Sequence, residues 1–122
     1  MDFTSQTPIY IQIAEDIRRR VLAGELVGGD QLMSTTQYAT TYRINPATAN
    51  KAFNMLVDEG IVEKRRGIGM FITPGAKGIL TTAGRADYRA EILEPAIENG
   101  LALGLTPAQL IDLANQIVKD RS

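Results

Sequence analysis

The sequence predicts an α+β fold that is mostly α-helical, with three short helices, a two-stranded hairpin and a further helical region after residue 74. Helix-start signals occur near residues 8, 35 and 46, where a capping residue stands beside a proline or at capping-box spacing. A Gly-Ile-Gly tip between two strand-like runs predicts the hairpin. Because Pro74-Gly75 marks a boundary, we expect one domain over residues 1–74 and a second region over residues 75–122.

The first helix is expected to start at Thr7-Pro8, because a hydroxyl can cap a helix and proline suits the first helical position. Apolar residues then recur every four positions and form one core-facing stripe: Ile9, Ile13, Ile17 and Val21. Gly24 ends this helix, and Gly28-Gly29 predicts a loop between residues 26 and 30.

The second and third helices also begin with capping signals. Ser34 and Gln37 have the spacing of a capping box, and Asn45-Pro46 combines a cap with a proline. Gly60 suits the position just after the end of the third helix. The side chains expected in the core are Tyr38, Ala39 and Tyr42 on the second helix and Ala49, Ala52, Phe53 and Leu56 on the third.

Residues 61–66 and 70–73 read as two strands around the tip Gly67-Ile68-Gly69. Three helices followed by such a hairpin form a winged helix-turn-helix, in which the third helix enters the major groove of DNA. Polar side chains on the outer face of the third helix suit this fold, because asparagine can pair with adenine and lysine with guanine or a phosphate. The start of this helix is also expected to offer free backbone N–H groups to a phosphate.

Lys64, Arg65 and Arg66 add cations beside the tip, although alternation along a strand points Arg65 away from the other two. A plainer interpretation is open: the polar residues would be cap and solvent residues, and the cations would protect an edge strand. We favour DNA because a capped helix, a polar-faced helix and a basic hairpin occur together. The candidate DNA-binding residues are Ser34, Thr36, Gln37, Asn45, Ala47, Thr48, Asn50, Lys51, Lys64, Arg65, Arg66, Gly67, Ile68 and Gly69.

Composition narrows the classes of protein that fit. The chain of 122 residues has no Cys, which fits a reducing compartment, and no His, which removes the commonest general base and zinc ligand. The net charge of −1 does not itself point to nucleic acid, but the cations are clustered, and local placement decides phosphate binding. We expect Arg18-Arg19-Arg20 to be a solvated face. The chain has neither a secretory signal pattern nor a long apolar run, so we expect a cytoplasmic protein without membrane contact. Because no group of residues suits a metal or a catalytic site, we expect no enzyme activity, cofactor or metal.

The C-terminal region carries two apolar faces. Pro95 predicts a kink or a break near residues 91–95, and Thr106-Pro107 predicts the start of a last helix. Apolar faces of this kind are rarely left exposed; they could pack back on their own domain, but we favour a homodimer. The candidate dimerisation residues are Ile79, Ala83, Ala86, Ala90, Leu93 and Ile97, spaced alternately by four and three, and Leu110, Leu113 and Ile117 on the last helix.

Several segments resemble the DNA-binding domain of the GntR family of bacterial transcription regulators. They are PIYIQIAEDI (8–17), LAGEL (22–26), GDQL (29–32) and RRGIGMFI (65–72). Asn45-Pro46-x-Thr48 and the short C-terminal region resemble the YtrA subfamily. The resemblance implies a homodimer, joined through its small helical C-terminal region, that binds an inverted repeat in double-stranded DNA. It also implies a repressor that often controls genes for ABC transporters.

The sequence departs from that family at four positions. Thr36 stands where the family usually has an arginine that grips a phosphate, and Arg43 stands at a turn position often held by glycine. Ile68 and Met70 replace a cation and a threonine of the wing. These changes remove cations from the expected footprint, so we predict modest affinity and a shallow dependence on salt.

A second function remains open at this point: a winged helix that contacts an acidic protein partner instead of DNA. Binding to the DNA upstream of the protein's own gene separates the two, because a protein-contact module should not bind there preferentially. We expect any small-molecule effector to bind between the C-terminal helices and the DNA-binding domain, where Tyr88 or Arg89 lies.

Overall fold

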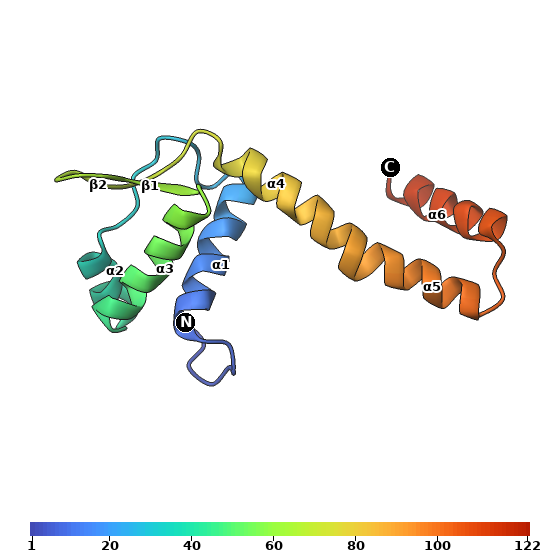
Figure 1. The fold of residues 1–122 in the computed structure, drawn as a ribbon, viewed down its shortest axis with the longest axis horizontal. Helices are drawn as coiled ribbons and strands as arrows, with labels where there is room; N and C mark the ends of the chain where they lie inside the picture. Colours follow the sequence, from blue (N-terminus) through green and yellow to red (C-terminus); the bar gives the residue numbers. More distant parts are fainter. The chain divides into compact units, whose positions relative to one another are not determined.

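A computed structural model describes residues 1–122, which form two compact units, Met1–Thr82 and Ala83–Ser122 (Figure 1). The first unit contains three helices, a hairpin and the beginning of a fourth helix: α1 (Ile9–Leu22), α2 (Thr35–Tyr42), α3 (Pro46–Asp58), β1 (Val62–Arg65), β2 (Gly69–Ile72) and α4 (Ala76–Asp87). After the end of α4, the second unit contains a π-helical segment and two helices: η1 (Tyr88–Leu93), α5 (Glu94–Ala102) and α6 (Pro107–Arg121). The predicted fold class is confirmed.

The core of the first unit lies where α3 packs against α1 and α2 and where the hairpin covers their ends. All the residues predicted to face inward from α3 are fully buried, with no exposed surface: Ala49, Ala52, Phe53 and Leu56. On α1, Ile13, Ile17 and Val21 are buried, and Ile9 is half-buried against the same cluster. The two alanines allow close approach, since the side chains at a helix contact set the distance between helix axes.

The helix ends mostly follow the predicted signals. Ser34 forms a complete capping box with Gln37 at the start of α2, and Asn45 caps α3. The end of α3 is a Schellman motif, in which Ile61 N–H donates to the Leu56 carbonyl at 3.0 Å around Gly60, whose φ is 81°. The prediction for α1 was wrong by one residue: Pro8 is the N-cap, and its carbonyl accepts from Gln12 N–H.

The turn between α2 and α3 depends on a left-handed residue. Arg43 ends α2 with φ 54° and ψ 50°, and the next residue, Ile44, donates its N–H to the Ala39 carbonyl at 3.0 Å. A side chain at this conformation costs about 1–2 kcal/mol relative to glycine. The non-glycine residue therefore strains the turn without reshaping it.

The hairpin has a third neighbour that the sequence did not reveal. β1 and β2 pair antiparallel, from Val62 opposite Ile72 to Arg65 opposite Gly69. The segment 29–32 runs along the other edge of β2, where Leu32 N–H donates to the Met70 carbonyl at 2.8 Å. The predicted loop is therefore correct for the turn but incomplete, because its end pairs with the wing.

In the second unit, a kink or a break was expected near residues 91–95; the chain does not break there but forms the π-helical segment η1. The backbone stays helical through Leu93 and Glu94, and Glu94 N–H donates to the carbonyl of Arg89, five residues earlier. In a regular α-helix the ring of Pro95 would clash with the carbonyl of Glu91 and leave it without a donor. The wider turns of η1 shift the hydrogen-bonding pattern and accommodate the proline.

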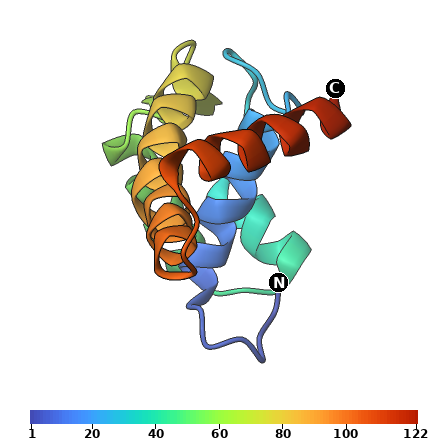
Figure 2. The ribbon, with the colours of Figure 1, turned by 90° about the vertical axis from the view of Figure 1, so that its right-hand side faces the viewer.

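The helices α5 and α6 leave most of their apolar side chains exposed. The chain turns after α5, and α6 runs back beside it at an angle to its axis (Figures 1 and 2). The cap predicted for α6 is confirmed, since Thr106 and Gln109 form a capping box. Gly100 is the one buried residue of this unit. An apolar groove of about 490 Å³ lies between α5 and α6. No helix of the chain combines the length and the hydropathy needed to cross a membrane.

Tyr38 is the one core side chain with an unpaired polar group. It is 6% exposed, its ring packs edge-on against Phe53 at 5.5 Å between ring centres, and its hydroxyl has no hydrogen-bond partner. Burial raises the pKa of Tyr38 from 10.0 to about 12. The neutral form is thus favoured in the folded state, so its contribution to stability is complete below pH 10 and is lost as pH rises through about 12.

We predict that Tyr38→Phe raises the free energy of unfolding by roughly 1 kcal/mol at pH 7, because it removes a buried hydroxyl that has no partner. Between pH 10 and 12 the advantage of the variant should grow, since its core no longer contains an ionisable group at this position. Urea unfolding of both proteins at pH 7, 10 and 11 measures this. A loss of 1 kcal/mol or more at pH 7 would show that the hydroxyl is hydrogen-bonded after all.

Candidate nucleic-acid interface

Burial of one face of α3 fixes which of its side chains remain outside. The exposed residues of α3 include Ala47, Asn50, Lys51, Asn54 and Asp58. Asn50 holds a central position, because it lines a hollow on each of two sides of α3. One hollow is shared with the hairpin and the other with α1.

The first hollow, here called the wing hollow, has a volume of about 270 Å³ and lies between the start of α2, α3 and the hairpin. It brings together many of the residues predicted from sequence to bind DNA. Its lining includes Ser34, Asn50, Lys64, Arg65, Gly67, Ile68 and Gly69. The sequence prediction missed Thr35 and Met70, which line the same hollow.

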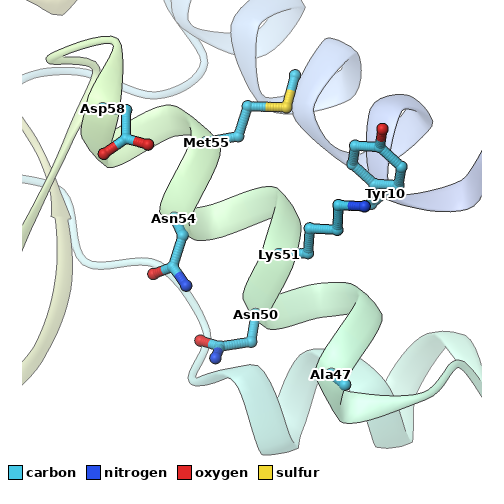
Figure 3. Close-up of a pocket in the computed structure, with 7 residues that line it drawn as sticks. All are labelled: Tyr10, Ala47, Asn50, Lys51, Asn54, Met55 and Asp58. Carbon is cyan, nitrogen blue, oxygen red and sulfur yellow. The ribbon is translucent and has the colours of Figure 1, made fainter.

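The second hollow, here called the α1 hollow, is a shallow depression between α3 and Tyr10 on α1 (Figure 3). Its volume is about 540 Å³. Figure 3 shows Asn50 and Asn54 projecting to one side of α3, whereas Lys51 extends towards Tyr10. The ammonium of Lys51 lies 4.1 Å from the centre of the Tyr10 ring. Lys51 therefore points away from the wing, which the helix pattern alone did not predict.

The cations of the wing differ in what they contact. Arg65 donates to Glu63 at 2.8 Å, and its guanidinium lies 4.0 Å from the centre of the Phe71 ring. Lys64 alternates to the other face, in register with Met70, and has no acidic partner. These contacts fit the predicted alternation of Lys64 and Arg65, although both residues line the wing hollow, and Lys64 is the one of the two without a carboxylate partner.

The start of α3 does not offer free N–H groups, so that expectation was wrong. Pro46 has no N–H, the Ala47 N–H donates to Asn45 Oδ1 at 2.8 Å, and the next two N–H groups donate to the Asn45 carbonyl. At the start of α2, by contrast, the N–H groups of Thr35 and Thr36 have no partner. The helix end available to an anion is therefore that of α2, beside the wing hollow.

Several other predicted residues already have structural roles. Gln37 Oε1 accepts from the Ser34 N–H at 3.1 Å, and Ser34 Oγ accepts from the Gln37 N–H at 3.1 Å, so the proton of the Ser34 hydroxyl is still free to donate. Thr48 is half-buried, whereas Thr36 and Arg66 are exposed. These positions therefore differ in how much of each side chain can reach a partner.

The arginines of α1 are all paired with carboxylates. Arg18 donates to both oxygens of Glu59 at 2.8 Å and so joins α1 to the end of α3. Arg19 and Arg20 lie 2.6 and 3.0 Å from Asp16. These pairs offset most of the positive charge on α1. Arg19 is exposed, but Arg18 and Arg20 are half-buried, so the solvated face expected there is found only in part.

Gln31 is a further residue that the sequence prediction missed. Its Nε2 donates to the carbonyl of Ile68 at the wing tip at 3.1 Å. Gly69, with φ 146°, packs so closely that a Cβ there would lie 2.7 Å from the same nitrogen. Gln31 thus holds the tip in place, and no local pattern in the sequence could have indicated this contact.

The residues proposed for an effector lie on η1. Tyr88 is 52% exposed, and Arg89 Nε lies 3.3 Å from the carboxylate of Glu94. The role suggested for them stays a prediction.

Three helices, a hairpin wing and an exposed polar face on the third helix define a winged helix-turn-helix DNA-binding protein. Residues 9–72 match the family described as "Bacterial regulatory proteins, gntR family". The chain belongs to the GntR family of transcriptional regulators, as its motifs indicated.

Two relatives from Bacillus subtilis match most of the chain. The HTH-type transcriptional repressor YtrA is 34% identical over 120 residues, which cover 98% of this chain and 92% of YtrA. The HTH-type transcriptional regulator YhcF is 34% identical over 110 residues, covering 90% of this chain and 89% of YhcF. The crystal structure of a transcriptional regulator from Oenococcus oeni matches with a TM-score of 0.81 and 25% identity over 97% of each chain. The chain is therefore a YtrA-like DNA-binding regulator.

We predict that Lys64→Met lowers DNA affinity by about fivefold and reduces the slope of log K against log salt by about 0.9, as the loss of one phosphate contact should. Arg65→Met should have a smaller effect on both quantities, because Arg65 is already held by Glu63 and Phe71. Fluorescence anisotropy across a salt series measures both variants. An equal loss for the two would contradict the assignment of Lys64 as the free cation.

Proposed function

We propose that this protein is a homodimeric repressor that binds an inverted repeat through the Asn50-centred face of α3. The observation that carries the proposal is the wing hollow. There the Asn50 amide, the free N–H groups at the start of α2 and the Lys64 ammonium border one surface. An amide that can read a base thus lies beside donors that suit a phosphate.

The proposed contacts divide by chemistry. Asn50 suits adenine, with which an asparagine amide can form two hydrogen bonds, and the Ala47 methyl suits the methyl group of thymine. Ser34, Thr35 and Thr36 offer a hydroxyl and two N–H groups to one phosphate. These uncharged donors would take the place of the arginine that the family usually has at the position of Thr36.

The wing supplies the remaining contacts of the proposal. Lys64 and Arg66 provide charge, and the tip, Gly67-Ile68-Gly69, allows the backbone to approach the sugar-phosphate chain closely. The Gln31 amide holds the tip through its hydrogen bond to the Ile68 carbonyl. Because few cations face the surface, the expected affinity is modest and the salt dependence shallow.

The dimer is proposed from the apolar surface of the second unit. Ile97 is 42% exposed and Ile117 58% exposed, and both line the groove between α5 and α6. A second copy that covers this surface would pair two DNA-binding units around a two-fold axis, which suits an inverted repeat. The other dimerisation candidates in this groove are Leu93, Leu110 and Leu113.

The dimerisation candidates before residue 91 are arranged differently from the prediction. Ala83 and Ala86 lie on α4, but Ala90 lies on η1, where the turns are wider than in an α-helix. Spacings of four and three therefore do not make one continuous stripe past residue 87. We place the centre of the proposed dimer contact on α5 and α6, and keep Ile79, Ala83, Ala86 and Ala90 as its periphery.

The regulated genes belong to the proposal as well. The resemblance to the YtrA subfamily supports repression of transporter genes, and the relative YtrA is named a repressor. No residue of the chain identifies the substrate of such a transporter.

The experiment that tests this function is fluorescence anisotropy with DNA from upstream of the protein's own gene and with scrambled DNA. We expect preferential binding of the upstream DNA and saturation at two chains per duplex. Asn50→Ala should lower affinity for the upstream DNA by roughly 5- to 100-fold, with little change for scrambled DNA, because base contacts carry discrimination. Asn115→Ala, which alters an exposed amide on α6, is the matched control.

Equal affinity for the two DNAs, unchanged by Asn50→Ala, would contradict the regulator proposal and favour a winged helix that contacts protein. Saturation at one chain per duplex would contradict only the dimer. Ile117→Ser separates these parts, because it should reduce upstream affinity while leaving the weak binding to scrambled DNA in place.

A further inference from the structure

Lys51 is held on the side of α3 that faces α1. Its ammonium lies 4.1 Å from the centre of the Tyr10 ring, within the range of a cation–π contact, and it has no acidic partner. Tyr10 is half-buried and packs against the core cluster, near the buried Ile13 of the same helix. The ring is therefore a fixed platform, whereas the lysine alone would be a flexible chain.

Asn50 separates Lys51 from the wing. Its side chain borders the wing hollow together with Lys64, and it also borders the α1 hollow together with Lys51 and Tyr10 (Figure 3). The two lysines thus lie on opposite sides of the residue proposed to read a base. A helix in the major groove has one phosphate strand on each side, at a groove width of about 12 Å.

We propose that Tyr10 is a positioning residue that directs Lys51 to the phosphate strand on the α1 side of the groove. The inference rests on the proposed function, and it extends the DNA footprint to α1. Lys51 would have to leave the Tyr10 ring to reach bases beside Asn50, and would then lose the cation–π contact. Lys51 therefore contributes affinity for any DNA sequence, and base discrimination rests on Asn50 and its neighbours.

The far end of the α1 hollow limits this contact. Ala47 lies near the start of α3 and Asp58 at its other end. Asn54 lies between Asp58 and Asn50 along the helix (Figure 3). A carboxylate repels a phosphate, so the strand on this side is expected to pass Ala47, Lys51 and Asn54 and to leave the surface before Asp58.

The test uses the full chain and measures affinity for upstream and scrambled DNA across a salt series. Lys51→Met should lower affinity for both DNAs by the same factor, roughly two- to fivefold, and reduce the slope of log K against log salt by about 0.9. Lys119→Met removes the same charge from α6 and should change neither quantity. A loss confined to upstream DNA would overturn the inference, because Lys51 would then be reading bases.

The role of Tyr10 is tested by coupling to Lys51. Tyr10→Leu should reproduce most of the affinity loss seen in Lys51→Met. Tyr10→Phe should retain wild-type affinity because it keeps the ring. The double variant Tyr10→Leu/Lys51→Met should bind DNA no more weakly than Lys51→Met. A residue with only a packing role would weaken binding equally in the presence and absence of Lys51, which would overturn the inference. A loss in Tyr10→Phe would overturn it too, and this variant keeps the test valid if Tyr10→Leu unfolds.

Failure of the inference can be distinguished from failure of the proposed function. If wild-type protein prefers upstream DNA and Asn50→Ala removes the preference, the function stands whatever Lys51 does. If wild-type protein binds both DNAs equally, the sequence-specific function fails, but the Lys51 results still decide the phosphate contact. If it binds neither DNA, both proposals are overturned.

Discussion

The structure depends on the burial of one face of α3 against α1. Ala49, Ala52, Phe53 and Leu56 have no exposed surface, and Tyr38 of α2 packs on Phe53, so all three helices meet at this face. A helix whose inner face is fixed has its outer face fixed as well, because the two are set by the same 3.6-residue period. The position of Asn50, between the wing and α1, therefore follows from the core and not from any contact of its own.

The polar groups at the starts of α2 and α3 are proposed to have different roles in DNA binding. Asn45 and Pro46 satisfy or remove the donors at the start of α3, so this helix can present only its side chains to DNA. The start of α2 keeps two N–H groups free, and they lie beside Ser34 at the edge of the wing hollow. Neutral donors at this helix end compensate for the cations that the chain lacks relative to its family, although more weakly than a charged side chain would.

The sequence was sufficient for features that depend on neighbouring residues. The capping box at Ser34, the helix start at Thr106-Pro107, the glycine after α3 and the core face of α3 were all predicted, because each rests on spacing within one element. The pairing of residues 29–32 with β2, the stacking of Lys51 on Tyr10 and the engagement of Arg65 were not predicted. The first two contacts join residues that are distant in the sequence, and Arg65 has more than one possible partner on the hairpin. Only the packed structure therefore shows which contact is made. Near Pro95 the sequence indicated that the helix is disturbed but not in what form, since a proline does not show how the backbone accommodates it, here by π-helical turns.

DNA is proposed to bind to the face formed by α2, α3 and the wing. NMR titration of the labelled protein with upstream DNA tests it most directly, because backbone amides report contact residue by residue. We expect the largest shifts at Thr35 and Thr36, whose N–H groups are free, at Asn50 and at the wing tip, with little change along α6. Shifts confined to α6 or to the exposed side of α1 around Arg19, with Thr35 and Asn50 unmoved, would contradict it.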